Sequence, residues 1–300
     1  MSPLLVRTTL FAVVTLAALG CGEPTEPVEI DEETDEESST PRDYDGPIGG
    51  DREVEPIFPE DYDVDGDHPL LLLLHGFGSN ANETLAGFNI EEEASNRGVV
   101  ILAPEGKTDS RDDQFWNATE YCCDLDETGV DDVGYLTGLI DEAVEQYAVD
   151  PDQVFAMGIS NGAMMSHRMA CDRGDLLRGI ASFNGTSMLE ADNCNPEDPT
   201  HIVHIHGTDD EVVPYDGNAV FPSAEEVVDR WVDFNDCDPD PVDGSSVNVT
   251  AAVDGDETTI DYYDNCVDGG DVEFWTMHGA RHVPLPLADF EHLIFDTLLD

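Results

Sequence analysis

The stretch VFAMGISNGA, residues 154–163, contains the pattern that decides the expected fold. Its first four residues are apolar and predict a short buried strand, and residues 163–170 are typical of a helix. Between them lies G-x-S-x-G, with Ser160 at its centre. A strand, tight turn and helix in this order expose the serine hydroxyl and point a helix N-terminus at an oxygen that becomes negative during attack. We therefore predict that Ser160 is a nucleophile; a chance match in a glycine-containing turn is the alternative.

Other apolar runs predict the rest of a mostly parallel central sheet flanked by helices. Five of them have the length of strands that are buried on both faces: 70–74, 99–103, 179–183, 202–205 and 272–277. Helices are expected at 86–96, at 131–147 and at 287–299. Asp131 and Asp132 begin the second of these helices, so we expect caps there rather than catalysts. The alternation predicts an α/β fold with a single catalytic domain, residues 52–300.

The charge of the chain restricts its partners. The formal net charge is −57, with 68 acidic and 11 basic residues, and Lys107 is the only lysine. Phosphate groups would be repelled, so nucleic acid is not expected as a partner, nor is an anionic membrane surface bound through charge. Such an acidic surface predicts a host that lives in high salt and a protein that needs salt to screen its self-repulsion. An ordinary acidic secreted protein is the alternative.

The first 51 residues are expected to direct export. Arg7 precedes an apolar stretch at 10–19 that is too short to span a bilayer, which predicts a signal peptide over residues 1–20. It ends in ALGC, which resembles a bacterial lipobox, so Cys21 is the expected lipidation site; a plain secretory signal is the alternative. Residues 21–51 are acidic and almost free of large apolar side chains, which predicts a disordered tether. We expect an extracellular or outer-surface bacterial lipoprotein that meets the membrane only through its lipid.

The cysteines agree with export. Six remain after Cys21, an even number that predicts three disulfides in an oxidising compartment. Cys237 and Cys266 flank the last expected insertion and form the favoured pair. The pairing of the other four stays open: Cys122, Cys123, Cys171 and Cys194. A zinc site is disfavoured because the spacing is wrong and no paired histidines lie nearby.

Two loops that follow strands carry the partners that a nucleophilic serine needs. HGTDD at 206–210 places Asp209 or Asp210 at the C-terminal end of a strand, where an α/β sheet presents functional groups. HGARHVP at 278–284 follows the last strand and contains His282, with His278 as the alternative general base. The order serine, aspartate, histidine is that of α/β-hydrolase triads.

A third loop, HGFGS at 75–79, resembles the oxyanion loop of α/β-hydrolases. We expect the main-chain N–H of Phe77 to bind an oxyanion together with that of Asn161. Other motifs invite metal interpretations that we do not favour. Residues 61–67 begin like a calcium loop but lack the acidic twelfth residue, so an acidic turn is expected. His204 and His206 share a strand face without a carboxylate at ligand spacing, so we expect packing or hydrogen bonding there, with no metal or cofactor.

Together these motifs resemble the secreted feruloyl esterase and polyhydroxybutyrate depolymerase-like group of α/β-hydrolases. The resemblance covers about residues 68–290 and rests on PLLLLLHG at 69–76, WN at 116–117 before the cysteines at 122–123, DDVGY at 131–135, DP at 150–151, the residues at 158–165 and HGTDDEVVPY at 206–215. In that group the acid is the second residue after His-Gly-Thr, which favours Asp210 over Asp209. The histidine is usually followed by x-Trp-Pro, whereas Val283 and Pro284 follow His282 directly here, so the substrate pocket should differ.

The resemblance implies a serine hydrolase that cleaves carboxylic esters through an acyl-serine intermediate and without a cofactor. We expect it to be a monomer. Its implied substrates are 3-hydroxybutyrate polyesters or oligomers, feruloylated or acetylated plant polysaccharides, and small aryl esters. Two alternatives are a serine peptidase on the same fold and a catalytically silent hydrolase fold that binds a partner at the cell surface.

Overall fold

The computed structural model describes residues 46–284, 286 and 289–299 of the 300-residue chain. The expected signal peptide, Cys21 and the tether up to residue 45 lie outside these residues. Residues 46–51, which we assigned to the tether, belong to the packed domain: Ile48 is buried and forms a β-bridge with Val54. The Tyr147 hydroxyl also donates to the carbonyl oxygen of Gly46. The folded domain therefore includes residues before the expected boundary at 52, because the buried Ile48 and the hydrogen bond from Tyr147 attach them to the domain.

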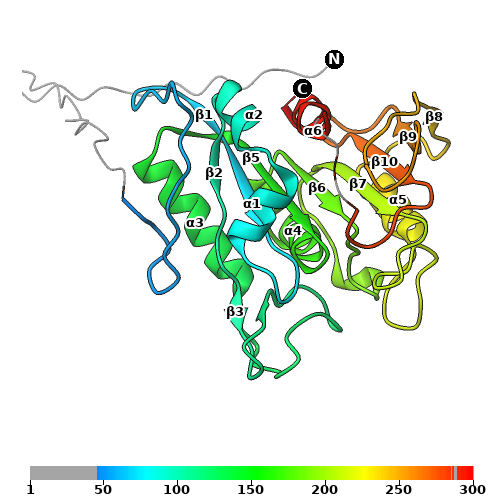
Figure 1. Cartoon of the computed structure of the whole chain (residues 1–300), viewed down its shortest axis with the longest axis horizontal. Coiled ribbons are helices and arrows are strands. Elements are labelled where there is room, and N and C mark those ends of the chain that lie inside the picture. The colour runs from blue at the N-terminus through cyan, green and yellow to red at the C-terminus, as the bar shows by residue number, and fades with distance from the viewer. Residues whose placement is uncertain (1–45, 285, 287–288, 300) are drawn as a thin grey trace, which may run out of the picture. The chain divides into compact units, whose positions relative to one another are not determined.

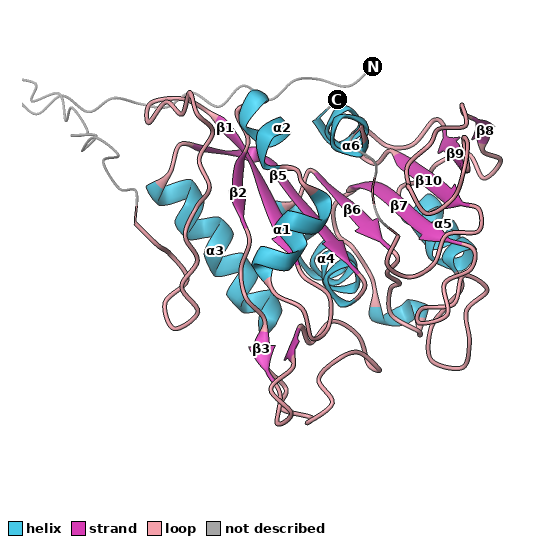
Figure 2. Ribbon diagram, viewed as in Figure 1, coloured by secondary structure: helices cyan, strands magenta, loops and turns pink. Residues whose placement is uncertain are grey.

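An eight-stranded sheet runs through the domain in the order β2–β1–β5–β6–β7–β10–β9–β8 (Figures 1 and 2). The first six strands are parallel. At one edge β9 pairs antiparallel with β10, and β8 pairs antiparallel with β9. The bounds are β1 (His68–Leu74), β2 (Val100–Leu102), β5 (Val149–Ile159), β6 (Gly179–Phe183), β7 (His201–Gly207), β8 (Val242–Asp243), β9 (Thr258–Tyr263) and β10 (Val272–Met277). A separate pair consists of β3 (Lys107–Thr108) and β4 (Gln114–Phe115). This architecture confirms the predicted α/β-hydrolase fold.

Helices cover both faces of the sheet (Figure 2). One face packs against α3 (Asp132–Gln146), α4 (Asn161–Arg173) and α5 (Ala224–Phe234), and the other against α1 (Ala81–Phe88), α2 (Glu91–Asn96) and α6 (Phe290–Leu299). Two short 3₁₀ turns, η1 (Gly174–Leu176) and η2 (Ala191–Asn193), lie between β5 and β7. The five leucines of β1 alternate between the two cores, with Leu70, Leu72 and Leu74 facing the α3 side. A run without polar residues forms here because both faces are covered.

Several local elements differ from the expectations. The helix expected at 86–96 is two helices, because Asn89 adopts a left-handed conformation (φ 55°) and its N–H closes α1 onto the carbonyl oxygen of Leu85. Helix α5 was not predicted, although Ser223 and Glu226 form a capping box at its start. Strand β9 was not predicted either, since it lies in the segment that we had regarded as an insertion.

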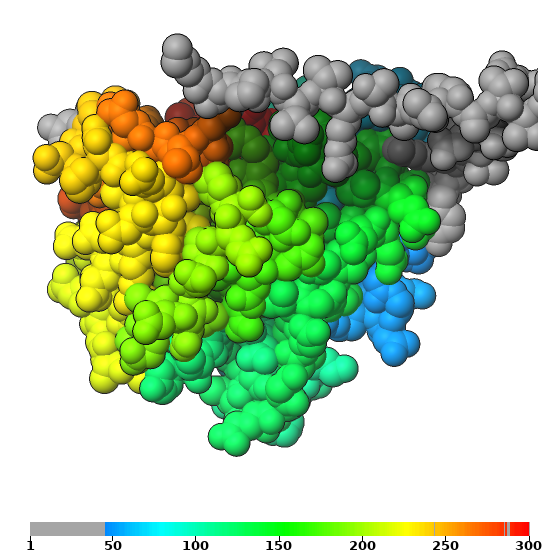
Figure 3. All heavy atoms as spheres, turned by 180° about the vertical axis from the view of Figure 1, so that it is seen from behind, coloured from blue at the N-terminus to red at the C-terminus, as the bar shows by residue number. Residues whose placement is uncertain are grey.

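The carboxyl ends of the parallel strands bring the candidate functional loops to one edge of the sheet. The loops that follow β1, β5, β7 and β10 contain residues 75–79, Ser160, Asp210 and His282 respectively. The chain between β4 and α3 projects from the body of the domain at the bottom of Figures 1 and 3. The topology thus joins residues that are far apart in the sequence, as expected for a site at the C-terminal edge of an α/β sheet.

Candidate active site

Ser160 occupies a sharp turn between β5 and α4. Its backbone has φ 55° and ψ −118°, outside the conformations that a serine usually adopts, and its N–H donates to the carbonyl oxygen of Phe183 at 2.9 Å. Flanking glycines make the turn sterically possible. A Cβ atom on Gly158 would lie 2.4 Å from the carbonyl carbon of Gly162, and one on Gly162 would lie 2.1 Å from the carbonyl oxygen of Leu74. These contacts explain why the motif requires glycine on both sides of the serine.

Ser160, His282 and Asp210 form a continuous hydrogen-bonded series. Nε2 of His282 lies 2.9 Å from Oγ of Ser160, and Nδ1 of His282 lies 2.7 Å from Oδ2 of Asp210. The carboxylate can only accept, so Nδ1 carries the proton and Nε2 is left to accept from the serine hydroxyl. The other oxygen of Asp210 accepts the N–H groups of Val212 and Val213 at 2.8 and 2.9 Å. Both carboxylate oxygens are therefore held, which fixes the orientation of the acid.

The environment of Asp210 favours its ionised form. Burial acts to raise the pKa of this carboxyl, but hydrogen bonds from His206 and His282 outweigh burial and lower the pKa well below its usual range. The side chain is fully buried, whereas that of His282 is 12% exposed. Asp210 is therefore a permanent negative charge beside an imidazole that reaches the surface.

The alternatives considered from sequence lie elsewhere. Asp209 is exposed, and the side chain that contacts His282 is that of Asp210. His278 pairs with the Thr259 hydroxyl at 3.1 Å on the surface rather than with the serine. The structure therefore brings together the three residues that the sequence analysis favoured.

The loop after β1 is shaped by His75. This buried imidazole accepts the N–H of Gly106 at Nε2 and donates from Nδ1 to the carbonyl oxygen of Gly76 at 2.8 Å. Burial lowers the pKa of His75, against the raising effect of its bond to Gly76, so the ring is neutral. Among the described residues, no protein acceptor takes the N–H of Phe77 or of Asn161. Both predicted oxyanion donors are thus left for another acceptor.

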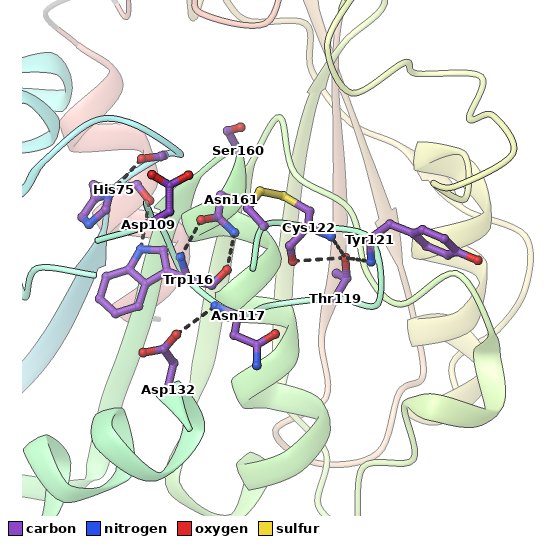
Figure 4. The surroundings of a disulfide bond; sticks show 12 residues. His75, Asp109, Trp116, Asn117, Thr119, Tyr121, Cys122, Asp132, Ser160 and Asn161 are labelled. Carbon is purple, nitrogen blue, oxygen red and sulfur yellow. Dashed lines mark hydrogen bonds between the residues drawn. A yellow bond between two sulfur atoms is a disulfide. The ribbon is translucent and has the colours of Figure 1, made fainter. Parts of the chain in front are cut away.

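The side chain of Asn161 has a role that sequence reasoning missed. Its Oδ1 accepts the N–H of Trp116 at 2.7 Å, and its Nδ2 donates to the Trp116 carbonyl oxygen at 2.9 Å (Figure 4). The indole N–H of Trp116 donates in turn to the carbonyl oxygen of His75 at 3.0 Å. One tryptophan thus links the serine turn to the loop of Phe77. Trp116 and Asn117 belong to the motifs that carry the family resemblance, but nothing in those motifs indicates that Trp116 contacts the Asn161 side chain.

The two aspartates at the start of α3 have separate tasks. Asp131 caps the helix, because its Oδ1 accepts the N–H of Gly134 at 2.8 Å, as expected. Asp132 is buried and instead binds Arg52 at 2.7 Å and the N–H of Asn117 at 2.8 Å. It therefore supports the loop that carries Trp116 (Figure 4).

Three disulfides join the six cysteines predicted to be paired. Cys237 is bonded to Cys266, which is the pair that the sequence favoured. The four whose pairing stayed open form Cys171–Cys194 and the vicinal bond Cys122–Cys123. The vicinal pair lies on the same loop as Trp116 and close to the serine turn (Figure 4). The Cys171–Cys194 bond ties α4 to the segment after β6, and all three bonds lie on the side of the sheet that packs against α4 and α5.

A cavity of about 350 Å³ opens beside Ser160. Its walls are mostly apolar and come from α1, β6 and the loop of His282, while the carboxylate of Glu83 adds a charge that is hydrogen-bonded to the Ser79 hydroxyl. The lining residues are Gly76, Phe77, Ser79, Glu83, Thr84, Gly87, Phe88, Ile159, Ser160, Phe183, His282, Val283, Pro284 and Pro286. Cavities of this size and character bind small ligands. Val283 and Pro284 supply wall positions where the resembled family usually has x-Trp-Pro.

The motifs that invited metal interpretations form ordinary contacts. Within 61–67, the Asp63 carboxylate accepts the N–H of Asp65, which makes a local turn. His204 and His206 are buried and hydrogen-bonded to other side chains or main chain. In the described part of the chain, no three His, Cys, Asp or Glu side chains are grouped as metal ligands would be. Over the same residues, no helix has the length and apolar character needed to cross a membrane.

Comparisons with known sequences agree with this geometry. The family model described as phospholipase/carboxylesterase matches residues 63–230, more than half of the chain. Feruloyl esterase B of Piromyces equi is 26% identical over 243 residues, which are 77% of this chain and 42% of that protein. The putative esterase NocK of Nocardia uniformis is 32% identical over 155 residues (52% and 44%), and a probable feruloyl esterase C of Aspergillus niger is 28% identical over 193 residues (63% and 63%). The chain thus spans between two fifths and two thirds of the length of these relatives.

Solved structures share the fold. An acetyl xylan esterase from Aspergillus awamori superimposes with a TM-score of 0.61 at 11% sequence identity, over 84% of this chain and 97% of the other. A single-residue variant of SOBER1 from Arabidopsis thaliana superimposes with a TM-score of 0.51 at 18% identity, over 77% and 98%. With the strand order and the family match, these findings lead to one assignment: the chain belongs to the phospholipase/carboxylesterase family of α/β-hydrolases.

Proposed function

We propose that the protein is a serine hydrolase that cleaves carboxylic esters through an acyl-serine intermediate. The observation that carries this proposal is the series Ser160–His282–Asp210, with separations of 2.9 and 2.7 Å, at the mouth of an apolar cavity. Membership of a carboxylesterase family supports it. A neutral serine hydroxyl is a weak nucleophile, and this geometry provides the base that activates it.

The reaction begins when Oγ of Ser160 attacks the ester carbonyl carbon and its proton passes to Nε2 of His282. The imidazolium that forms is held by the ionised carboxylate of Asp210, which also keeps the ring in the required tautomer. His282 then returns the proton to the leaving alcohol oxygen as the carbon–oxygen bond breaks. Water, deprotonated by the same histidine, hydrolyses the acyl-serine and restores the free enzyme.

The negative oxygen of each tetrahedral intermediate needs donors. The N–H groups of Phe77 and Asn161 flank the serine and have no protein acceptor among the described residues, which supports their assignment as the oxyanion hole. Losing one such donor in a serine hydrolase costs about 10²–10³ in rate. The bonds of Trp116 to Asn161 and His75 tie the two donor segments together.

The cavity indicates the acyl group. Phe88, Phe183, Val283 and Pro284 make its walls apolar, so it suits a short aliphatic or an aromatic acyl chain. Relatives named as feruloyl esterases and a structural neighbour named as an acetyl xylan esterase support aromatic and acetyl esters of plant polysaccharides as candidate substrates. Esters of short hydroxy acids are retained from the family resemblance.

The site of action is proposed to be outside the cell. Three disulfides in the described domain support an oxidising compartment. The apolar stretch at 10–19 and the lipobox-like ALGC support export and acylation at Cys21. Labelling of the expressed chain with a radioactive fatty acid, lost in a Cys21→Ala variant, tests the anchor.

The function is tested by hydrolysis of p-nitrophenyl esters from acetate to octanoate, methyl ferulate, acetylated xylan and 3-hydroxybutyrate oligomers in molar salt. We expect turnover of at least one class and its loss, by a factor of about 10⁴ or more, in Ser160→Ala. Ser110→Ala removes an exposed serine elsewhere in the chain and serves as the matched control.

A fluorophosphonate probe separates an enzyme from a binding protein. The proposal requires covalent labelling of the wild type and of Ser110→Ala, but not of Ser160→Ala. A folded protein that hydrolyses none of the panel and is not labelled would be a binding module, and retained turnover in Ser160→Ala would exclude this nucleophile.

A further inference from the structure

A chain of buried aromatic nitrogens runs from the core to the acid of the proposed triad. It links α5, α4 and β7 on the face of the sheet that packs against those helices. All of its members are buried. The contacts are Trp231 Nε1 to His167 Nδ1 (3.0 Å), His167 Nε2 to His204 Nδ1 (3.2 Å), His204 Nε2 to His206 Nδ1 (3.4 Å), and His206 Nε2 to the Val213 carbonyl oxygen (2.9 Å) and to Asp210 Oδ2 (3.5 Å).

The two ends of this chain set the same direction for every hydrogen bond. An indole N–H can only donate, so His167 must accept at Nδ1 and carry its proton at Nε2. His204 then accepts at Nδ1 and donates from Nε2, and His206 does the same. At the other end, a carbonyl oxygen can only accept, so the Val213 carbonyl independently requires a proton on Nε2 of His206. Three neutral rings satisfy both ends with one proton each.

Reversal of the chain would be costly. If each ring carried its proton at Nδ1, the bare Nε2 of His206 would face the Val213 carbonyl oxygen and the Asp210 carboxylate. At the other end, the indole N–H of Trp231 would meet an N–H of His167. Both unfavourable contacts would be buried, where an unpaired polar group costs the most free energy.

We propose that His206 is a positioning residue for the triad acid, and that Trp231, His167 and His204 hold it in the Nε2–H tautomer, which donates to the Val213 carbonyl oxygen and places its N–H 3.5 Å from the Asp210 carboxylate. The inference rests on the proposed function of Ser160, His282 and Asp210. His206 fastens the turn from Asp210 to Val213 at both ends, while the N–H groups of Val212 and Val213 occupy the other carboxylate oxygen. The acid therefore keeps one orientation toward His282.

Burial disfavours the charged form of the two inner rings, His167 and His204. Burial, and then the proximity of His206, lowers the pKa of His167 to about 3. Burial and the two neighbouring histidines lower the pKa of His204 well below its usual range. Asp210 is faced by His206 from β7 and by His282 from the loop after β10, whereas Glu211 and Arg281 nearby are exposed and paired with each other at 3.7 Å.

The first test reads the tautomers directly. In the full chain labelled with ¹⁵N-histidine, long-range ¹H–¹⁵N correlation spectra distinguish Nδ1–H, Nε2–H and imidazolium rings for the nine histidines. His167, His204 and His206, assigned from single His→Gln variants, should each give an Nε2–H signal at neutral pH. An Nδ1–H or imidazolium signal from any one of them would overturn the directed chain.

The second test uses kinetics. His206→Phe removes the donor to the Val213 carbonyl oxygen and the N–H that lies beside Asp210, and it should lower kcat about ten- to hundredfold with little change in KM. The acidic limb of the pH profile of kcat/KM should move to higher pH, because a carboxylate without the neighbouring N–H dipole interacts more strongly with the imidazolium of His282. His206→Gln keeps an N–H at similar reach and should restore part of kcat. An unshifted profile with wild-type kcat in folded His206→Phe would refute the role of His206.

A matched pair of tryptophan variants tests whether Trp231, at the end of the series away from Asp210, affects turnover. Trp231→Phe removes the donor that starts the chain, while Trp275→Phe removes an equally buried indole that donates to Glu273 on the opposite face of the sheet. We expect kcat to fall about three- to tenfold in Trp231→Phe and to stay within about twofold of wild type in Trp275→Phe. Equal effects would mean that lost packing alone is responsible. If the wild type has no ester turnover, the proposed function fails, whereas the tautomers still test the chain.

Discussion

The two hydrogen bonds between the Asn161 side chain and the Trp116 main chain should contribute measurably to the stability of the fold. Asn161→Ala removes the partners of two buried backbone groups, the Trp116 N–H at 2.7 Å and the carbonyl oxygen at 2.9 Å. Leaving a buried group unpaired costs about 1–3 kcal/mol, so the free energy of unfolding should fall by about 2–6 kcal/mol. At about 2–4 °C per kcal/mol for a domain of this size, Tm should fall by at least about 4 °C.

A neighbouring asparagine provides the control. Asn117 lies on the same loop, and its side chain makes one partly buried hydrogen bond, to the Val130 carbonyl oxygen at 2.9 Å. Asn117→Ala should therefore cost only about 0.5–1.5 kcal/mol. The main-chain N–H of residue 161 survives in both variants, so the loss of kcat in Asn161→Ala should be smaller than the factor of about 10²–10³ typical of a deleted oxyanion donor.

Urea denaturation followed by tryptophan fluorescence measures both variants, with circular dichroism to check that the transitions coincide. The reasoning would be refuted if Asn161→Ala were destabilised no more than Asn117→Ala. It would also be refuted if the midpoint were unchanged while kcat collapsed, since the side chain would then act on the reaction rather than on the loop.

Three further predictions follow from other parts of the molecule. Gly162→Ala should unfold the protein or abolish turnover, because the new Cβ would lie 2.1 Å from the Leu74 carbonyl oxygen. Gly138→Ala is the control: the space around its Cβ is open, so the substitution should stabilise α3 by about 1 kcal/mol. Urea titration and ester turnover measure both variants. Burial lowers the pKa of His201 to about 4. Between about pH 6.5 and pH 4 the imidazole is therefore protonated in the unfolded chain but not in the folded chain, so the free energy of unfolding should fall as the pH drops through this range. His201→Gln should reduce that slope in urea titrations at several pH values, and an unchanged slope would contradict the prediction. A net charge of −57 predicts that Tm rises from low salt to molar NaCl, measured by differential scanning calorimetry; a flat or falling Tm would contradict it.

Several features of the fold could be predicted because they depend on local patterns. Apolar runs such as 70–74 predicted buried parallel strands, since a strand covered on both faces needs no polar side. The glycines around Ser160 predicted the turn, because only glycine tolerates the backbone contacts found there. Asp131 was expected to cap its helix and does so. Helix α5 could have been predicted from its capping box, whereas β9 offers only a short run of β-branched and aromatic residues.

The sequence alone therefore determined the six parallel strands, the nucleophile turn and the succession of serine, aspartate and histidine along the chain. Only the tertiary structure decided which aspartate reaches His282, how Cys122, Cys123, Cys171 and Cys194 pair, and what the side chain of Asn161 holds. The physical reason is that most of these contacts join segments tens of residues apart, whose meeting depends on strand order and loop paths rather than on local preference. The directed chain from Trp231 to Asp210 belongs to the same class, because its polarity is set by two ends that the fold alone brings into line.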